Sequence, residues 1–425
     1  MKKYLLPSVI SCVLFSSTIY ADSFADLEQA VAELNRSPEE DRLEFQAWYK
    51  AHLQEYSTWR KAFLEKWDAE RASSVIAWGD TQVDSEHVAV LYEENQRTVI
   101  DFEANELVIE VRDGEMLSNE QLESFISQQL ANPELNVFHL KGEDLKETVV
   151  IEQRDISYSV EQEREALREI LKQANLQLQD IDKTASSIEM MSQHTIDDDL
   201  LRQEKETLVV DAKSRMNELS ALYQEQRDMT IDETPVITYR LKMPNSSLEK
   251  RVAPYLDDIY HQSEVFDVEP ALIVAIMHSE SSFNPRARSP IPAFGLMQVV
   301  TTSAGHDVNR IVHNVDRPMN EQDLYQPEYN IEAGTAYLDI LNSRYLRAIK
   351  DPQSREYCVI AAYNTGAGNV ARAFGERRLS AAVEKINTLS PQEVYENLMA
   401  NLPYEETIHY LKKVTERKEM YQGQI

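Results

Sequence analysis

The chain has 425 residues, a formal net charge of −30 and 42% hydrophobic residues. This length gives room for two or three domains with a sizeable core. The negative charge argues against electrostatic binding to nucleic acid or to an anionic membrane, and no basic patch or glycine-rich phosphate loop stands out. Residues 245–425 carry 18 Lys and Arg against 24 Asp and Glu, a net of −6, so a charge of −24 falls on residues 1–244. The acidity therefore belongs to the N-terminal half.

The chain begins with Met1-Lys2-Lys3 and an apolar segment that ends at Ala21, which is typical of a secretory signal in residues 1–21. The segment is short and serine-rich for a membrane span. Cleavage after Ala21 would leave a soluble protein, which predicts a periplasmic location. The alternative is a lipoprotein site with a lipid on Cys12. Soluble export is favoured, because only eight residues separate Lys3 from Cys12 and the apolar run continues beyond the cysteine.

Residues 22–159 are predicted to form a small domain of mixed helices and strands. Two apolar stripes at helical spacing predict helices over 23–75. The period then changes to two at 88–92, 98–102 and 107–111, which predicts an antiparallel meander. Ser118 and Gln121 have the spacing of a capping box that opens a helix to about Gln129. The stripes consist of Phe24, Leu27, Ala30, Val31 and Leu34, and of Trp48, Leu53, Trp59, Phe63 and Trp67.

A long helical hairpin is predicted to interrupt this domain at residues 160–232. Apolar residues between Leu167 and Ile188 follow a four-three spacing typical of a coiled coil, and a second stripe resumes at Leu208. The hairpin could recognise a partner protein or hold the rest of the chain away from a membrane, but a solvated structural insertion is the favoured interpretation. Residues 233–244 contain a strand candidate, Val236 to Leu241, that would return to the mixed domain.

The last domain, residues 245–425, contains the most informative carboxylate. Leu272, Ile276 and Glu280 are spaced i, i+4, i+8, so the carboxylate continues an apolar helix face. A carboxyl group that leaves a core stripe at the lip of a cleft is desolvated, and desolvation raises its pKa as a general acid requires. A solvated or ion-paired glutamate at the helix end is the alternative from this residue alone.

Three motifs surround this glutamate in order along the chain. They are Glu280-Ser281-Ser282-Phe283-Asn284-Pro285, then Gly295-Leu296-Met297-Gln298, then Ala362-Tyr363-Asn364-Thr365-Gly366-Ala367-Gly368. Together they resemble the catalytic domain of the soluble-lysozyme-like (SLT) lytic transglycosylases, which cleave the glycan strands of peptidoglycan. The resemblance is specific from about residue 245 to 421, weaker over about 60–150, and fails between about 155 and 232.

The resemblance implies an α+β chain. Its mainly α-helical, lysozyme-like catalytic domain would follow a small mixed α/β domain that carries the long hairpin insertion. Relatives in this family are often outer-membrane lipoproteins, which is the reason to keep lipidation of Cys12 as an alternative. The expected partner is the peptidoglycan glycan strand, with a further protein partner for the hairpin as an option. No nucleic acid is expected to bind, and membrane contact is expected only if the chain is lipidated.

In this family Glu280 would protonate the leaving oxygen of the MurNAc–GlcNAc bond. The 6-hydroxyl of the substrate would then attack C1 and leave a 1,6-anhydro-MurNAc end, with the same glutamate as base. Ordinary glycosidases use two carboxylates, whereas the segment from Ser281 to Val300 contains none; Asp307 is the nearest later one. Two alternatives stay open, a goose-type-lysozyme-like hydrolase and a non-catalytic wall-binding or scaffold protein.

Further residues are predicted to contact the glycan. Gly295 would let the backbone approach the sugar, and the amides of Gln298 and Asn364 would form hydrogen bonds, whereas core packing explains Met297 and Tyr337 equally well. The full predicted set is Ser281, Ser289, Gly295, Leu296, Met297, Gln298, Tyr337, Tyr363, Asn364 and Tyr410.

The chain departs from the usual family pattern in two places. Thr365 stands where relatives commonly have a glycine, and Pro290 and Pro292 stiffen the loop before Gly295. No metal or cofactor is expected, because no His and Cys residues have metal-ligand spacing. Cys358 has the setting of a buried core thiol.

Overall fold

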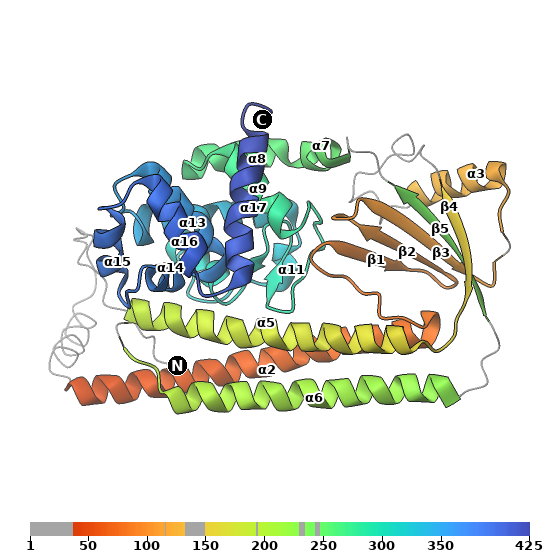
Figure 1. Ribbon diagram of the computed structural model, residues 1–425, viewed down its shortest axis with the longest axis horizontal. Coiled ribbons are helices and arrows are strands. Elements are labelled where there is room, and N and C mark those ends of the chain that lie inside the picture. The colour runs from red at the N-terminus through yellow and green to blue at the C-terminus, as the bar shows by residue number, and fades with distance from the viewer. Residues whose placement is uncertain (1–36, 115, 132–148, 193, 229–233, 243–246) are drawn as a thin grey trace, which may run out of the picture.

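The computed structural model describes residues 37–114, 116–131, 149–192, 194–228, 234–242 and 247–425. The predicted signal segment, Cys12 and the stripe from Phe24 to Leu34 lie outside these residues. A helical region, a small antiparallel sheet and a layer of three long helices make up the structure, so the predicted α+β class is confirmed (Figure 1). The predicted division at residues 159/160, 232/233 and 244/245 stays a prediction.

Three long helices lie side by side beneath both the sheet and the remaining helices (Figure 1). They are α2 (Pro38–Trp78), α5 (Val160–Ser192) and α6 (Asp198–Asp228). Ser37 caps α2 through a capping box with Glu40, and Gly79 ends it with a φ of 79°. The predicted hairpin is therefore present as α5 and α6. It is not a solvated insertion, because α5 packs against α14 (Ala367–Ala373) of the helical region.

The sheet has the order β1-β2-β3-β5-β4, with every neighbouring pair antiparallel. The predicted meander forms β1 (Val88–Tyr92), β2 (Gln96–Asp101) and β3 (Glu106–Arg112), and the returning strand is β5 (Pro235–Lys242). Leu122 and Ile126 of α3 (Asn119–Leu130) cover one face of this sheet. The predicted capping box of Ser118 and Gln121 is confirmed. The sequence did not predict β4 (Val150–Asp155), because four of its six side chains are polar.

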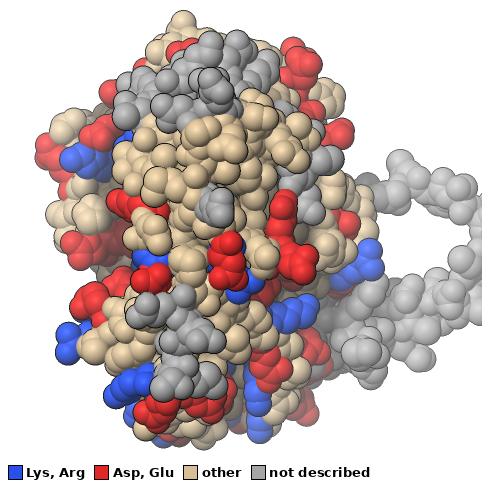
Figure 2. All heavy atoms as spheres, turned by 90° about the vertical axis from the view of Figure 1, so that its right-hand side faces the viewer, with Lys and Arg blue, Asp and Glu red and all other residues tan. Residues whose placement is uncertain are grey.

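The surface at the sheet end of the molecule is mixed in charge. In Figure 2 the basic side chains among the described residues form small separate groups between acidic ones. A nucleic-acid-binding face presents a continuous basic area, and the described residues on this face do not form one. Within the described residues, no helix is long and apolar enough to cross a membrane.

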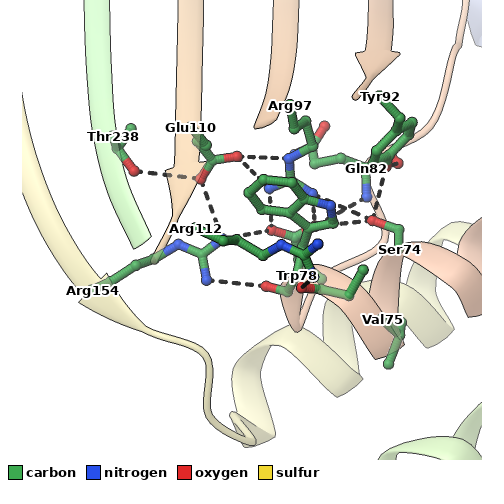
Figure 3. A network of polar contacts seen from close by, with 12 residues as sticks. Ser74, Val75, Trp78, Gln82, Tyr92, Arg97, Glu110, Arg112, Arg154 and Thr238 are labelled. Atoms are coloured by element: carbon green, nitrogen blue, oxygen red, sulfur yellow. Dashed lines mark hydrogen bonds and ion pairs between the residues drawn. The ribbon is translucent and has the colours of Figure 1, made fainter. Parts of the chain in front are cut away.

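A buried network of charges joins the end of α2 to the sheet (Figure 3). Arg97 of β2 is 1% exposed and donates to Glu110 at 2.7 Å and to Asp80 at 2.6 and 2.7 Å. The Trp78 ring lies 4.7 Å from the Arg97 guanidinium carbon and 4.9 Å from that of Arg112. A buried charge costs several kcal/mol unless it is paired, so this network fixes where α2 meets the sheet.

Residues 247–425 fold into a helical region with one short β-hairpin. Its central helix is α9, whose residues Ile273 to Met277 are all 0% exposed. The hairpin consists of β6 (Ala293–Phe294) and β7 (Val299–Val300). The helices are α7 (Ser247–Val252), α8 (Leu256–Phe266), α9 (Pro270–Glu280), α10 (Ala304–Ile311), α11 (Glu321–Leu324), α12 (Pro327–Asp339), α13 (Pro352–Thr365), α14 (Ala367–Ala373), α15 (Leu379–Ile386), α16 (Pro391–Asn401) and α17 (Glu405–Tyr421).

The long helix α2 belongs to the core of this helical region. Phe63, Leu64 and Trp67 are buried in the same hydrophobic cluster as α9. The Phe63 ring meets the Phe294 ring edge to face, with centroids 5.8 Å apart and an interplanar angle of 83°. The helical region therefore depends for its packing on a helix that lies about two hundred residues earlier in the chain.

We expect Phe63→Ala to lower the free energy of unfolding by about 3–5 kcal/mol, because it leaves a cavity in this core. Leu43→Ala is the matched control on the same helix, since Leu43 is 54% exposed; it should change stability by no more than about 0.5 kcal/mol. Urea unfolding followed by tryptophan fluorescence measures both. Equal, small effects of the two substitutions would show that α2 is not part of the core.

Candidate active site

The carboxyl group of Glu280 lies at the end of the buried helix α9 and is itself only partly exposed. Burial is the largest cause that raises its pKa, from an ordinary value of 4.5 to about 8. The negative charges of Glu86 and Glu406 add to the rise, whereas Tyr410 and the cation of Lys183 oppose it. The carboxyl group therefore keeps its proton near neutral pH, which is the state a general acid needs.

Two carboxylates far away in sequence thus act on Glu280. Glu86 lies in the irregular segment before β1, and Glu406 lies in the first turn of α17. Asp307, the nearest later carboxylate in sequence, accepts a hydrogen bond from the Tyr345 hydroxyl at 2.9 Å and pairs with Arg310 at 3.0 Å. Sequence reasoning missed Glu86, because no local motif marks it.

The turn after Glu280 is held by buried hydrogen bonds. The Ser281 hydroxyl is 0% exposed, lies 2.7 Å from the Leu296 carbonyl oxygen, and accepts a bond from the Phe283 amide at 3.1 Å. The bond to Leu296 holds the segment from Gly295 to Gln298 next to Glu280. Because the Ser281 hydroxyl already has both partners, its role here is to position this segment. Ser282 and Phe283 have φ values of 51° and 68°, a left-handed conformation that is costly for residues with side chains.

Packing is sufficient to explain why residue 295 is a glycine. Gly295 has a φ of +74°, and an added Cβ atom would lie 2.3 Å from the Leu324 carbonyl oxygen and 2.4 Å from Asn330 Nδ2. Asn330 also accepts from the Met297 amide at 2.7 Å. Leu296 and Met297 are both 0% exposed, so of the two interpretations of Met297 the structure favours core packing.

Gln298 differs from its neighbours, because part of its amide is left without a partner. Its Nε2 donates to the Gly295 carbonyl at 2.9 Å, whereas its Oε1 is buried and accepts no hydrogen bond among the described residues. A buried acceptor without a partner is uncommon in folded proteins. Tyr363 donates to the Met297 carbonyl at 2.9 Å, and its ring lies 5.7 Å from that of Tyr337. These two partly exposed rings therefore stand beside the same strip of backbone.

The third motif meets Glu280 through α17. The Asn364 side chain donates to Glu406 at 3.3 Å and accepts from the Thr407 hydroxyl at 2.7 Å. One turn along α17, the Tyr410 hydroxyl interacts with the Glu280 carboxyl group and favours its ionised form, although it makes no hydrogen bond of regular geometry among the described residues. Tyr363 and Tyr410 thus lie within electrostatic range of Glu280, and Asn364 is joined to the same helix as Tyr410.

The N-terminal half holds the loop that contains Ser289. Ser289 is buried, and its amide donates to the Ala293 carbonyl at 3.1 Å, so it fixes the loop from within. The neighbouring Arg288 lies 4.5 Å from the Trp67 ring of α2 and donates to the Asp84 carbonyl at 3.2 Å. Sequence reasoning did not identify this clamp, since all its partners lie in the other half of the chain.

A separate pocket of about 430 Å³ opens between α10 and α12, with His313 and Tyr329 in its lining. None of the predicted site residues lines it. Among the described residues, no group of three or more His, Cys, Asp or Glu side chains could hold a metal ion. Cys358 is buried, which raises the pKa of its thiol well above the usual range.

Comparison with known proteins shows what the segment around this site is similar to. Residues 259–385, which include Glu280, Gln298 and Asn364, match the family model described as "Transglycosylase SLT domain". This part of the chain is therefore similar to the transglycosylase SLT domain.

Individual proteins similar to this chain share the word transglycosylase in their names. The chain is 46% identical over 179 residues to "Membrane-bound lytic murein transglycosylase C" of Pectobacterium atrosepticum, covering 42% of this chain and 49% of the relative. It is 43% identical over 209 residues to the protein of the same name from Cronobacter sakazakii, covering 49% of this chain and 54% of the relative. The chain thus spans about half the length of the curated relatives it matches.

Solved structures of similar proteins include the lytic transglycosylase Slt of Pseudomonas aeruginosa, with 20% identity and a TM-score of 0.32 over 53% of this chain and 30% of the other. Another is the soluble lytic transglycosylase SLT70 of Escherichia coli, with 21% identity and a TM-score of 0.32 over 53% of this chain and 33% of the other.

The raised pKa of Glu280 predicts a pH-dependent stability. A carboxyl group whose pKa is higher in the folded chain stabilises the fold while it is protonated, and this contribution is lost as the pH rises from about 4.5 through about 8. We therefore expect the unfolding free energy of Glu280→Gln to equal that of the wild type below about pH 4.5. Above about pH 8 it should exceed the wild-type value by a few kcal/mol.

Urea unfolding at both ends of this range measures the difference. Glu384→Gln, at an exposed position on α15, is the matched control and should follow the wild type at both pH values. A Glu280→Gln variant that also follows the wild type throughout would show that the Glu280 carboxyl group is well solvated.

Proposed function

We propose that the chain is a peptidoglycan lytic transglycosylase with Glu280 as its general acid and base. The observation that carries this proposal is a protonated, partly buried carboxyl group at the end of α9, raised to a pKa of about 8. The SLT family match and the names of the relatives support the substrate class. Gln298, Tyr363, Asn364 and Tyr410 are proposed to bind the glycan, with Tyr337 beside Tyr363. Ser281, Ser289, Gly295, Leu296 and Met297 are proposed to shape the backbone of the site.

The proposed reaction needs one carboxyl group twice. Glu280 gives its proton to the glycosidic oxygen as the bond to C1 breaks and an oxocarbenium-like centre develops. The 6-hydroxyl of the same MurNAc residue then attacks C1, and the Glu280 carboxylate takes up the hydroxyl proton. The products are a free 4-hydroxyl on the leaving sugar and a 1,6-anhydro-MurNAc end. The Glu280 proton is restored, and no water is consumed.

One observation favours a second candidate, a hydrolase. Glu86 acts electrostatically on Glu280, and a second carboxylate can serve as a nucleophile or as a base for water. The lyase reaction does not require this group, whereas a hydrolase of the two-carboxylate kind does. Glu86→Gln therefore separates the two reactions.

We expect Glu280→Gln to fold and to lose at least about two orders of magnitude in cleavage rate, because it removes the acid and the base together. Mass spectrometry of digested glycan strands measures rate and product at once, and Glu384→Gln is again the matched control. Anhydro ends from the wild type and from Glu86→Gln are expected. Products that carry an added water, together with an equally deep loss in Glu86→Gln, would establish the hydrolase instead.

The proposed location is outside the cytoplasm, where peptidoglycan lies. Two locations are possible outside the cytoplasm. The chain is either released into the periplasm as a soluble protein or attached to the outer membrane through a lipid on Cys12. The relatives are named membrane-bound, which favours attachment, whereas the apolar run that continues beyond Cys12 favours release. Each lipid CH₂ buried in a membrane contributes about 0.8 kcal/mol, so a lipidated chain would stay with the membrane fraction.

Cys12→Ser tests the two forms of export. If the chain is released after Ala21, the variant and the wild type should fractionate alike, in the soluble periplasmic extract. This is the outcome we expect from the sequence. A wild type found in detergent-extracted membranes, with the variant unprocessed or released, would assign the lipidated form.

A further inference from the structure

One helix from the segment where the family resemblance fails reaches the third motif of the proposed site through α17. The helix α5 crosses beneath α14 and the first turn of α17 (Figure 1), and it packs against α14. Its Lys183 is 7% exposed, and Lys183 Nζ lies 3.8 Å from Glu406 and 5.3 Å from the centre of the Tyr404 ring. Lysine is rarely this buried unless it is paired, so these contacts hold its ammonium group at the start of α17.

Glu406 joins this ammonium group to Asn364. One oxygen of its carboxylate faces Lys183, and the other accepts from Asn364 Nδ2 at 3.3 Å. Asn364 Oδ1 accepts from the Thr407 hydroxyl at 2.7 Å, and Thr407 is 0% exposed. An amide turned by 180° would set its carbonyl oxygen against the Glu406 carboxylate, and both groups are acceptors. Glu406 therefore selects one orientation of the Asn364 amide.

Lys183 also balances the charge near Glu280. Burial is the largest cause of the raised Glu280 pKa; Glu406 adds to the rise, whereas the cation of Lys183 opposes it. Further groups within range of Glu280 are Glu86 before β1, Tyr410 of α17 and Tyr363 of α13. On its own helix Lys183 acts on Asp180, which accepts from Tyr56 of α2. Loss of the charge on Lys183 and loss of the charge on Glu406 should therefore move the Glu280 pKa in opposite directions.

We propose that Lys183 is a positioning residue for the lytic reaction: it holds the Glu406 carboxylate against Asn364 and thereby fixes the amide that meets the glycan. This role rests on the proposed function, in which Asn364 binds the strand. Lys183 lies outside residues 259–385, which match the family model, so the hairpin supplies a part of the site that this match does not include. Without the ammonium group, Glu406 turns toward solvent, since its side chain is already 44% exposed, and the Asn364 amide loses its fixed orientation.

Lys183→Met tests this role, because it removes the ammonium group and keeps an unbranched side chain. KM for soluble glycan strands should rise several-fold. The alkaline limb of kcat/KM should move to higher pH, since the cation that favours ionised Glu280 is gone. Lys172→Met is the matched control at an exposed position of the same helix and should keep the wild-type values. A folded Lys183→Met variant with the wild-type KM and pH profile would overturn the role of Lys183.

Glu406→Ala tests the same contact without a change in the buried part of α5, because Glu406 is exposed. KM should rise as in Lys183→Met, but the alkaline limb should move to lower pH, since Glu406 raises the Glu280 pKa. Glu405→Ala, at the exposed neighbouring position of α17, is the matched control. An unchanged KM in Glu406→Ala would show that Glu406 does not fix Asn364, whether or not Lys183→Met folds. A wild type that cleaves no glycan would contradict the proposed lytic activity itself, so the two failures are distinguishable.

Discussion

The arrangement of the molecule depends on one constraint, the burial of α2 on several sides at once. Phe63 and Trp67 enter the core of the helical region, whereas Tyr49 packs against the hairpin. At the end of α2, Trp78 is 1% exposed and lies between the guanidinium groups of two arginines from the sheet. Apolar burial contributes roughly 25 cal/mol per Å² and does not depend on direction. A buried ion pair, in contrast, requires a particular direction and distance between its two groups. One helix therefore sets the relative positions of all three parts.

This arrangement explains the electrostatics around Glu280. The segment after α2 supplies Glu86, α17 supplies Glu406, and both add to the rise in the Glu280 pKa that burial begins. Lys183, from the hairpin, is the cation that opposes them. The proton on Glu280 is thus controlled from three separate parts of the chain. Residues 247–425 cut away from the N-terminal half would keep the motifs but would lose Glu86 and Lys183.

The sequence predicted those parts of the structure that depend on residues close together in the chain. The end of an apolar helix at Glu280 could be predicted from the apolar run before it, and the strands of the meander from their period of two. The strand β4 has mostly polar side chains and leaves no such signal. The reason for Gly295 was also hidden, because the atoms that exclude a Cβ belong to Leu324 and Asn330. Contacts of this kind depend on tertiary packing, which periodicity does not describe.

The hairpin of α5 and α6 is a second case in which tertiary contacts could not be predicted from the sequence. Its polar composition predicted a solvated insertion, yet Gln173, Gln177 and Lys183 are buried. A buried polar group costs free energy unless it is hydrogen-bonded or paired, and each of these finds a partner outside α5. Such contacts have direction and distance, so they fix the register of α5 against the site, which apolar packing alone would leave freer. Polar contacts to the loop before Gly295 and to the first turn of α17 therefore make α5 a fixed part of the surroundings of Glu280.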